Sequence, residues 1–266
     1  MGALFETQAF YVSDPGASNT PYVPAAGDSL INRFFAGAAT ASLITFDREG
    51  VTAGYYRLRS PSMYDNVKGI HIAAAAGQSI FALQAEAVQP LLSQDTLIME
   101  GTGEAAAYDL VTMTRYYSNF DGSAMQLYSW GMIAPLIVNL YEVEIATTST
   151  ATPTAWEDTV ITTTENLLKA NTDHAVLGYT CDTALGGIAL KGSDTSSFRY
   201  GGPGIVNSPW TPNYFKRIGD MTGLPAIPVF NSANIFNTFV STIDTGVSTA
   251  SNVTLHLAQL ARNLTT

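Results

Sequence analysis

The stretch AVLGYTCDTALGGIALKGSDTSSFRYGGPGI, residues 175–205, has the same pattern as an earlier stretch, ASLITFDREGVTAGYYRLRSPSMYDNVKGI, residues 41–70. Each begins as an apolar strand that ends in Asp. Each then continues through a short turn, a strand led by Gly, a basic and polar run, and a closing Gly-Ile. Matched positions stay between 133 and 135 residues apart, which is half of the 266-residue chain. The shared pattern and constant spacing indicate an internal duplication at low sequence identity.

A duplicated chain of this length predicts two domains near the usual size rather than one large β domain. Apolar residues make up 46% of the sequence, enough for ordinary cores, whereas charged residues make up only 13%. That share is about half of the usual one. Either Thr, Ser, Asn and Gly wet the surface, or much of it is buried against other subunits, where charge is depleted. Both can hold at once.

The charge balance argues against a nucleic-acid groove. The formal net charge is −10, with only four Lys and eight Arg. These basic residues form no cluster, and phosphate binding needs grouped Lys and Arg. We therefore expect no direct contact with nucleic acid or with an anionic membrane. The first residues lack a signal-peptide pattern, and the most apolar run, residues 131–145, is too short and too polar to be a transmembrane segment.

The chain divides by composition into four parts. Residues 1–27, rich in Pro, Gly, Ser and Ala, predict an extended N-terminal arm. Residues 146–155, ATTSTATPTA, contain neither a charge nor a large apolar side chain and predict a linker. Residues 28–145 and 156–266 each contain about seven or eight short strand patterns separated by turn signals, which predicts one β-sandwich in each half.

Each half also contains one helical excursion late in its series of strands. In the second half, Thr211 and Pro212 form a helix start, an apolar face follows, and Gly223 forms a stop. This predicts a helix over residues 212–221. In the first half, residues 78–92 occupy the matching place and contain helix formers with apolar spacing, which predicts a short helix or a mixed segment.

Two similar sandwiches, a Thr/Pro linker, an N-terminal arm and a helix between late strands together resemble the double jelly-roll major capsid proteins of tailless icosahedral viruses, including bacteriophages, many with an internal membrane. The resemblance covers the whole chain and rests on architecture. It implies an all-β fold of two tandem jelly-roll β-sandwiches with a short helical excursion in each. It also implies a structural protein rather than an enzyme, with no cofactor.

In that family, homotrimers whose six jelly rolls make a pseudo-hexagonal tile assemble into the viral shell. The resemblance therefore implies that this chain resides in the virion and is assembled in the host cytoplasm. Its expected partners are its own copies, neighbouring capsomers and other capsid proteins such as vertex proteins. Two alternatives from the residues stay open: a secreted or surface β-sandwich module that binds carbohydrate, and a β-sandwich hydrolase.

The sequence predicts no catalytic, cofactor-binding or metal-binding residue. Its three His are spread apart, and it contains neither a nucleophile elbow nor a phosphate-binding loop. The single Cys181 fits a small core residue better than a reactive thiol. Glu142 and Glu144 share one strand face, as a glycosidase pair would, but the wet face of a strand explains them more simply. Asp47 with Glu49, and Asp182, end equivalent strands and fit turns better than calcium sites.

Aromatic residues are the better candidates for function. Trp210, Tyr214 and Phe215 cluster in the helical excursion of the second half, and Tyr128 and Trp130 lie in an extra segment of the first half. Such residues cover a core, anchor a subunit interface, or line a carbohydrate site. We name these five as interface candidates, with the core and ligand alternatives kept open.

Overall fold

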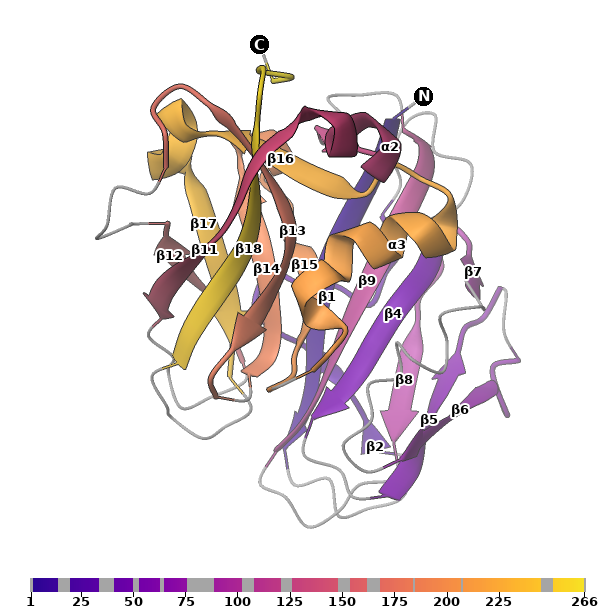
Figure 1. Cartoon of the computed structure of the whole chain (residues 1–266). Helices are drawn as coiled ribbons and strands as arrows, with labels where there is room; N and C mark the ends of the chain where they lie inside the picture. The colour runs from indigo at the N-terminus through magenta and orange to yellow at the C-terminus, as the bar shows by residue number, and fades with distance from the viewer. Residues whose placement is uncertain are drawn as a thin grey trace.

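The computed structural model consists mainly of antiparallel strands, which form four sheets (Figure 1). No helix among the residues it describes is long and apolar enough to cross a membrane. The described residues are 2–13, 20–33, 41–49, 53–62, 65–75, 89–101, 108–120, 126–147, 154–161, 168–183, 185–206, 208–244 and 251–265.

The first unit consists of strands β1 to β9. Their bounds are β1 (Gly2–Ser13), β2 (Thr20–Pro21), β3 (Val23–Pro24), β4 (Ala41–Glu49), β5 (Ala53–Arg59), β6 (Ile70–Ala75), β7 (Gln89–Leu91), β8 (Ile98–Gly101) and β9 (Tyr108–Phe120). One sheet has the order β3-β1-β9-β4-β7, and the other has the order β2-β8-β5-β6.

The second unit consists of strands β10 to β18. Their bounds are β10 (Leu127–Tyr128), β11 (Ile137–Thr147), β12 (Glu157–Val160), β13 (Asp173–Cys181), β14 (Leu185–Gly192), β15 (Tyr200–Gly204), β16 (Ile227–Asn231), β17 (Thr238–Ile243) and β18 (Ser251–Leu260). The sheets are ordered β10-β16-β13-β18-β11 and β12-β17-β14-β15. Its helices are α2 (Trp130–Ile133), η1 (Ala134–Leu136), η2 (Ser193–Thr195), η3 (Thr211–Asn213), α3 (Tyr214–Thr222) and η4 (Ser232–Asn237).

The two units share one topology. When the short strands β3 and β10 are set aside, eight of the described strands remain in each unit, and we number them one to eight in chain order within their unit. In both units, one sheet then has the order one-eight-three-six and the other has the order two-seven-four-five. This is the connectivity of a jelly roll. The prediction of two tandem jelly-roll β-sandwiches is therefore confirmed. The duplicated stretches contain strands three and four of each unit; residues 175–205 also contain the fifth strand, β15, whereas residues 41–70 end at the first residue of β6.

The prediction of an N-terminal arm is wrong for most of its length. β1 pairs with β9 from Gly2 to Ser13, and Leu4 and Phe10 are fully buried. Thr7 and Gln8 look solvent-facing in the sequence, yet both are buried as well. They are buried because both faces of β1 are covered. A strand covered on both faces lacks the alternation of apolar and polar residues by which a strand is recognised in a sequence.

The predicted division between the halves also needs correction. β11 was expected to close the first half, but it pairs along its length with β18 and is the first strand of the second unit. The predicted linker, residues 146–155, consequently lies between β11 and β12, and residues 148–153 of it are outside the described residues. In the predicted first-half excursion, residues 89–91 form β7, and residues 78–88 are outside the described residues.

The predicted helix of the second half is confirmed as η3 followed by α3, which ends at the left-handed Gly223. Its inner face packs on the glycine-rich strand β15, where the Tyr214 hydroxyl donates to the Gly201 carbonyl over 2.6 Å. The glycines Gly201, Gly202 and Gly204 all lie in β15, whose sequence is YGGPG. A Cβ on Gly202 would lie 2.3 Å from the Tyr214 hydroxyl, so glycine lets helix and strand approach.

Candidate assembly surfaces and a tryptophan groove

The outer face of β1 and β9 in the first unit packs against β15 of the second unit, forming a seam between the jelly rolls. The backbone N–H of Thr7 donates to the carbonyl of Arg199 over 2.7 Å. The N–H of Gly201 donates to the Thr7 hydroxyl over 2.9 Å, and the Thr114 hydroxyl donates to the Gly201 carbonyl over 2.8 Å. Small and polar side chains therefore join the two units at close range.

A buried carboxylate lies at one end of this seam. Asp28 of the first unit accepts from Trp156 Nε1 of the second unit over 2.9 Å and from the backbone N–H of Ala9 over 2.7 Å. Arg199 Nη1 lies 3.6 Å from its other oxygen, and the Asp28 side chain is 3% exposed. Burial raises the pKa of Asp28 to about 6, although both hydrogen bonds and Arg199 oppose the rise.

The corresponding outer face of the second unit is exposed along β11. Val138 and Leu140 are 58% and 62% exposed, and Glu142 and Glu144 continue the same exposed face. Their alternation fits the wet face of a strand. Beside them on β18, His256 lies with Nδ1 3.1 Å from Glu142 Oε1. Burial lowers the pKa of His256, and the Glu142 charge opposes this shift.

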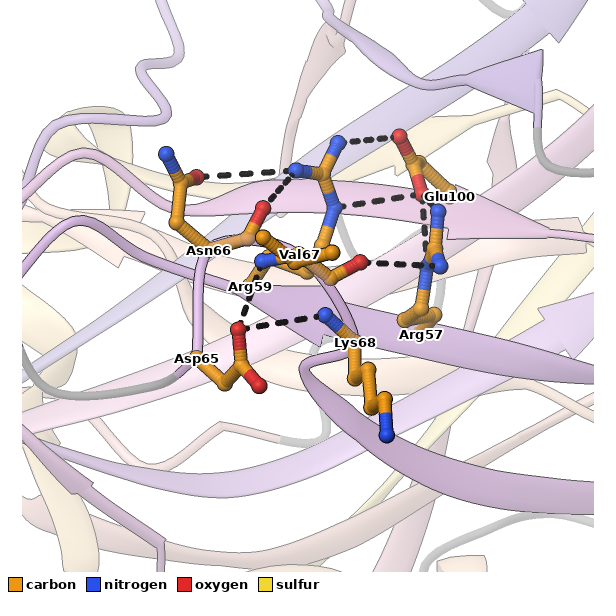
Figure 2. Close-up of polar contacts among 7 residues, drawn as sticks. All are labelled: Arg57, Arg59, Asp65, Asn66, Val67, Lys68 and Glu100. Carbon is orange, nitrogen blue, oxygen red and sulfur yellow. Dashed lines mark hydrogen bonds and ion pairs between the residues drawn. The ribbon is translucent and has the colours of Figure 1, made fainter.

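An ion-pair cluster of Arg57, Arg59 and Glu100 lies on strands β5 and β8 of the first unit (Figure 2). Arg57 and Arg59 both donate to the single carboxylate of Glu100, with Arg57 Nε 2.8 Å from Oε2. Burial raises the pKa of Glu100, but the two guanidinium groups outweigh it and hold that pKa below its usual range. One guanidinium charge therefore remains in excess at this cluster.

The same two arginines hold the turn between β5 and β6 (Figure 2). Arg57 Nη1 donates to the Val67 carbonyl over 3.2 Å, and Arg59 donates to the Asn66 carbonyl. The Asp65 carboxylate accepts from the N–H groups of Val67 and Lys68 over 2.7 and 3.2 Å. These contacts fix a turn that presents the exposed Val67 and the positive charge of Lys68.

The five interface candidates differ in their exposure and fall into three groups. Tyr214 and Phe215 are each 1% exposed and pack within the chain, so the prediction that they contact another subunit is wrong and the core alternative holds. Tyr128 is partly buried, and its hydroxyl donates to the Leu264 carbonyl over 2.9 Å. Trp130 and Trp210 remain 37% and 41% exposed.

Trp130 and Trp210 line one groove between α2 and α3, with a volume of about 520 Å³. Its other lining residues are Asn213, Lys216, Arg217, Asp220 and Met221. Lys216 Nζ lies 5.5 Å from the centre of the Trp130 ring, and the Arg217 guanidinium carbon lies 3.8 Å from the centre of the Trp210 ring. A charge therefore lies against each indole.

The other residues considered as sites have structural contacts. Cys181 is buried, and the Asp182 carboxylate accepts from the backbone N–H of Asn252 over 2.8 Å. His174 is fully buried and contacts the Tyr141 hydroxyl. Within the described ranges, no group of three or more His, Cys, Asp or Glu is arranged to hold a metal ion. The side chains of His71 and Asp47 lie outside the described residues.

The sequence matches no protein-family model and no curated protein. Solved structures similar to the chain include the major capsid protein P2 from bacteriophage PM2, at 8% identity over 98% of this chain and 99% of that one, with a TM-score of 0.21. The STIV major capsid protein is 9% identical over 98% and 97% of the two chains, with a TM-score of 0.19. The jelly-roll assignment rests on the strand order described above.

Proposed function

We propose that this chain is the major capsid protein of an icosahedral viral shell, and that three copies join into a pseudo-hexagonal ring of six jelly rolls. The seam inside the chain is the main support for this proposal. It joins two units of the same topology through different faces, the β1–β9 face of the first unit and the β15 face of the second. Such a head-to-tail contact repeats between copies and closes a ring when the rotation fits. The second unit offers its outer face on β11 and β18, and the first unit offers β5 and β6.

The composition of the fifth strand in each unit supports this arrangement. β15 is the fifth strand of the second unit, has the sequence YGGPG, and fits closely against Thr7 and Thr114. The fifth strand of the first unit, β6, has the sequence IHIAAA and is also rich in small residues. Small residues allow another sheet to approach the backbone, so β6 is suited to the β11–β18 face of a neighbouring copy.

Charge complementarity supports the same pairing. The exposed face of β11 carries Glu142 and Glu144. The surface around β5 combines three cations (Arg57, Arg59, Lys68) with two carboxylates (Glu100, Asp65), which leaves a net charge of +1. Opposite charges at facing surfaces favour one partner and one orientation.

In the proposed arrangement the two domains are residues 1–120 and 126–265. The protein resides in the virion after assembly in the host cytoplasm. Neighbouring capsomers and vertex proteins are its further partners.

The first experiment measures the native mass of the purified protein by light scattering, followed by electron microscopy of the same peak. We expect a trimer of the 28.3 kDa chain, or shells and flat hexagonal arrays. A monomer at every concentration would count against the proposal.

A charge exchange tests the proposed pairing of surfaces. Glu144→Lys and Lys68→Glu should each reduce the trimer fraction, because each places like charges at the contact. The double variant should restore it. Arg262→Glu makes the same charge change as Lys68→Glu at another exposed position and should leave the trimer fraction unaltered. A double variant that assembles no better than the single variants would refute the pairing of these two faces.

A further inference from the structure

The groove between α2 and α3 has the size and lining of a binding site. Its volume of about 520 Å³ lies within the range of pockets that hold small ligands or a few side chains. A second hollow of about 300 Å³ adjoins it and shares Trp130, Lys216 and Asp220. Two half-exposed tryptophans from segments 80 residues apart in the sequence thus form its walls. Tryptophan and arginine are the residue types that dominate binding energy at interfaces.

The α3 wall of the groove is anchored in the core. Tyr214, Phe215 and Ile218 anchor the inner face of α3 in the core. Asn213, Lys216, Arg217 and Asp220 follow one another at helical spacing, so they share the outer face. A ligand entering the groove would therefore meet, on the α3 side, a backbone that is already fixed before binding, which favours affinity.

The groove is positive in a chain whose net charge is −10. Lys216 forms an ion pair with Asp220 over 2.6 Å. Arg217 lies against Trp210, and no carboxylate among the described residues lies within ion-pair distance of it. Its planar guanidinium is suited to a two-point contact with a carboxylate. The lining offers two cations and cannot neutralise many phosphates, so a nucleic acid does not fit.

We propose that this groove binds an acidic peptide segment of another protein, with one aromatic or long aliphatic side chain as its anchor. The anchor enters between Trp130 and Trp210, and a neighbouring carboxylate pairs with Arg217. Charge complementarity favours this partner, because the groove joins two exposed indole rings to Arg217, which has no carboxylate of the described residues within ion-pair distance. The proposal is independent of the ring described above.

The test uses the acetylated and amidated peptide of sequence EDFDE, titrated into the full-length protein. The readout is the indole N–H signals of Trp130 and Trp210 in nitrogen-15 NMR spectra, assigned with the Trp130→Phe and Trp210→Phe variants. We expect saturable shifts of both signals, with a Kd on the order of 1 mM for so small a ligand. The peptide KKFKK, which keeps the anchor and reverses the charge, should leave both signals in place.

Arg217→Gln should weaken EDFDE binding roughly tenfold, the loss expected for one charge-assisted contact. Arg262→Gln removes an exposed arginine outside the groove and is the matched control. Absence of shifts, equal shifts with KKFKK, or equal weakening by both variants would overturn the proposal. Shifts produced by a neutral oligosaccharide and unaffected by Arg217→Gln would overturn it in favour of a carbohydrate site.

Discussion

Asp28 should make the stability of the protein fall as the pH rises from about 4 to about 7. Its carboxylate is buried at the seam, and burial raises its pKa to about 6 from an ordinary value of 3.8. The folded chain therefore binds this proton more tightly than the unfolded chain. The stabilising contribution is fully present below about 3.8 and is lost as the pH rises through about 6.

The size of the effect follows from the shift. One pKa unit corresponds to about 1.4 kcal/mol, so a shift of about two units contributes roughly 3 kcal/mol to the free energy of unfolding. Asp28→Asn cannot titrate, and its side-chain oxygen can still accept from Trp156. We therefore expect the difference in unfolding free energy, variant minus wild type, to rise by roughly 2.4 kcal/mol between pH 4 and pH 7, because the rest of the effect falls below pH 4.

The assay is reversible urea unfolding at a series of pH values, followed by circular dichroism. Asp65→Asn, at an exposed carboxylate with a lowered pKa, is the control and should not produce that rise. In a Trp130→Phe, Trp210→Phe background, the remaining Trp156 emission should titrate with a midpoint near pH 6. An Asp28→Asn variant with the same pH slope as the wild type, or a midpoint near pH 4, would refute the reasoning.

Three further substitutions test the packing. Gly202→Ala places a Cβ 2.3 Å from the Tyr214 hydroxyl and should cost about 1–3 kcal/mol in urea unfolding. At Gly131, a Cβ meets nothing within 4 Å, so equal losses in the two Ala variants would contradict this account. Tyr214→Phe removes the donor to the Gly201 carbonyl and should cost about 1 kcal/mol by the same method; no loss would show that this bond does not stabilise the fold. Glu100→Gln removes the charge between Arg57 and Arg59 and should cost about 2 kcal/mol, with faster amide hydrogen exchange over residues 65–69. Unchanged exchange there would show that the arginines do not hold the turn.

The sequence was sufficient for the fold where a strand and its turn are encoded together. Strands three and four of each unit are joined by a short turn, and their duplication is visible as a repeated pattern at constant spacing. Helix α3 was also predictable, since Thr211, Pro212 and Gly223 supply its start and stop signals. These features depend on neighbouring residues and so can be found without the fold.

The candidate surfaces were only partly predictable, because burial depends on contacts between distant segments. Among the aromatic candidates, Trp130 and Trp210 share a groove, whereas Tyr214 and Phe215 belong to the core. Helical spacing was a signal for the core residues, since Tyr214, Phe215 and Ile218 form one apolar face of α3 and Trp210 precedes the helix. No local signal shows that Trp130 lies in the same groove as Trp210, 80 residues away. The contribution of Asp28 to the seam was missed for the same reason, since its partner Trp156 lies 128 residues away.

The errors at the two unit boundaries have one physical origin. β1 and β11 are the first strands of units with the same topology, yet β1 is buried on both faces and β11 is exposed on one. The second unit covers β1, so Thr7 contacts Gly201. Nothing in the described part of the chain covers β11 in the same way, and Glu142 and Glu144 alternate with apolar residues. When two units of one fold are joined head to tail, one copy of each joining face stays without a partner inside the chain. Here these are the β11–β18 face of the second unit and the β5–β6 face of the first. A contact with another molecule should therefore be sought first at these two faces.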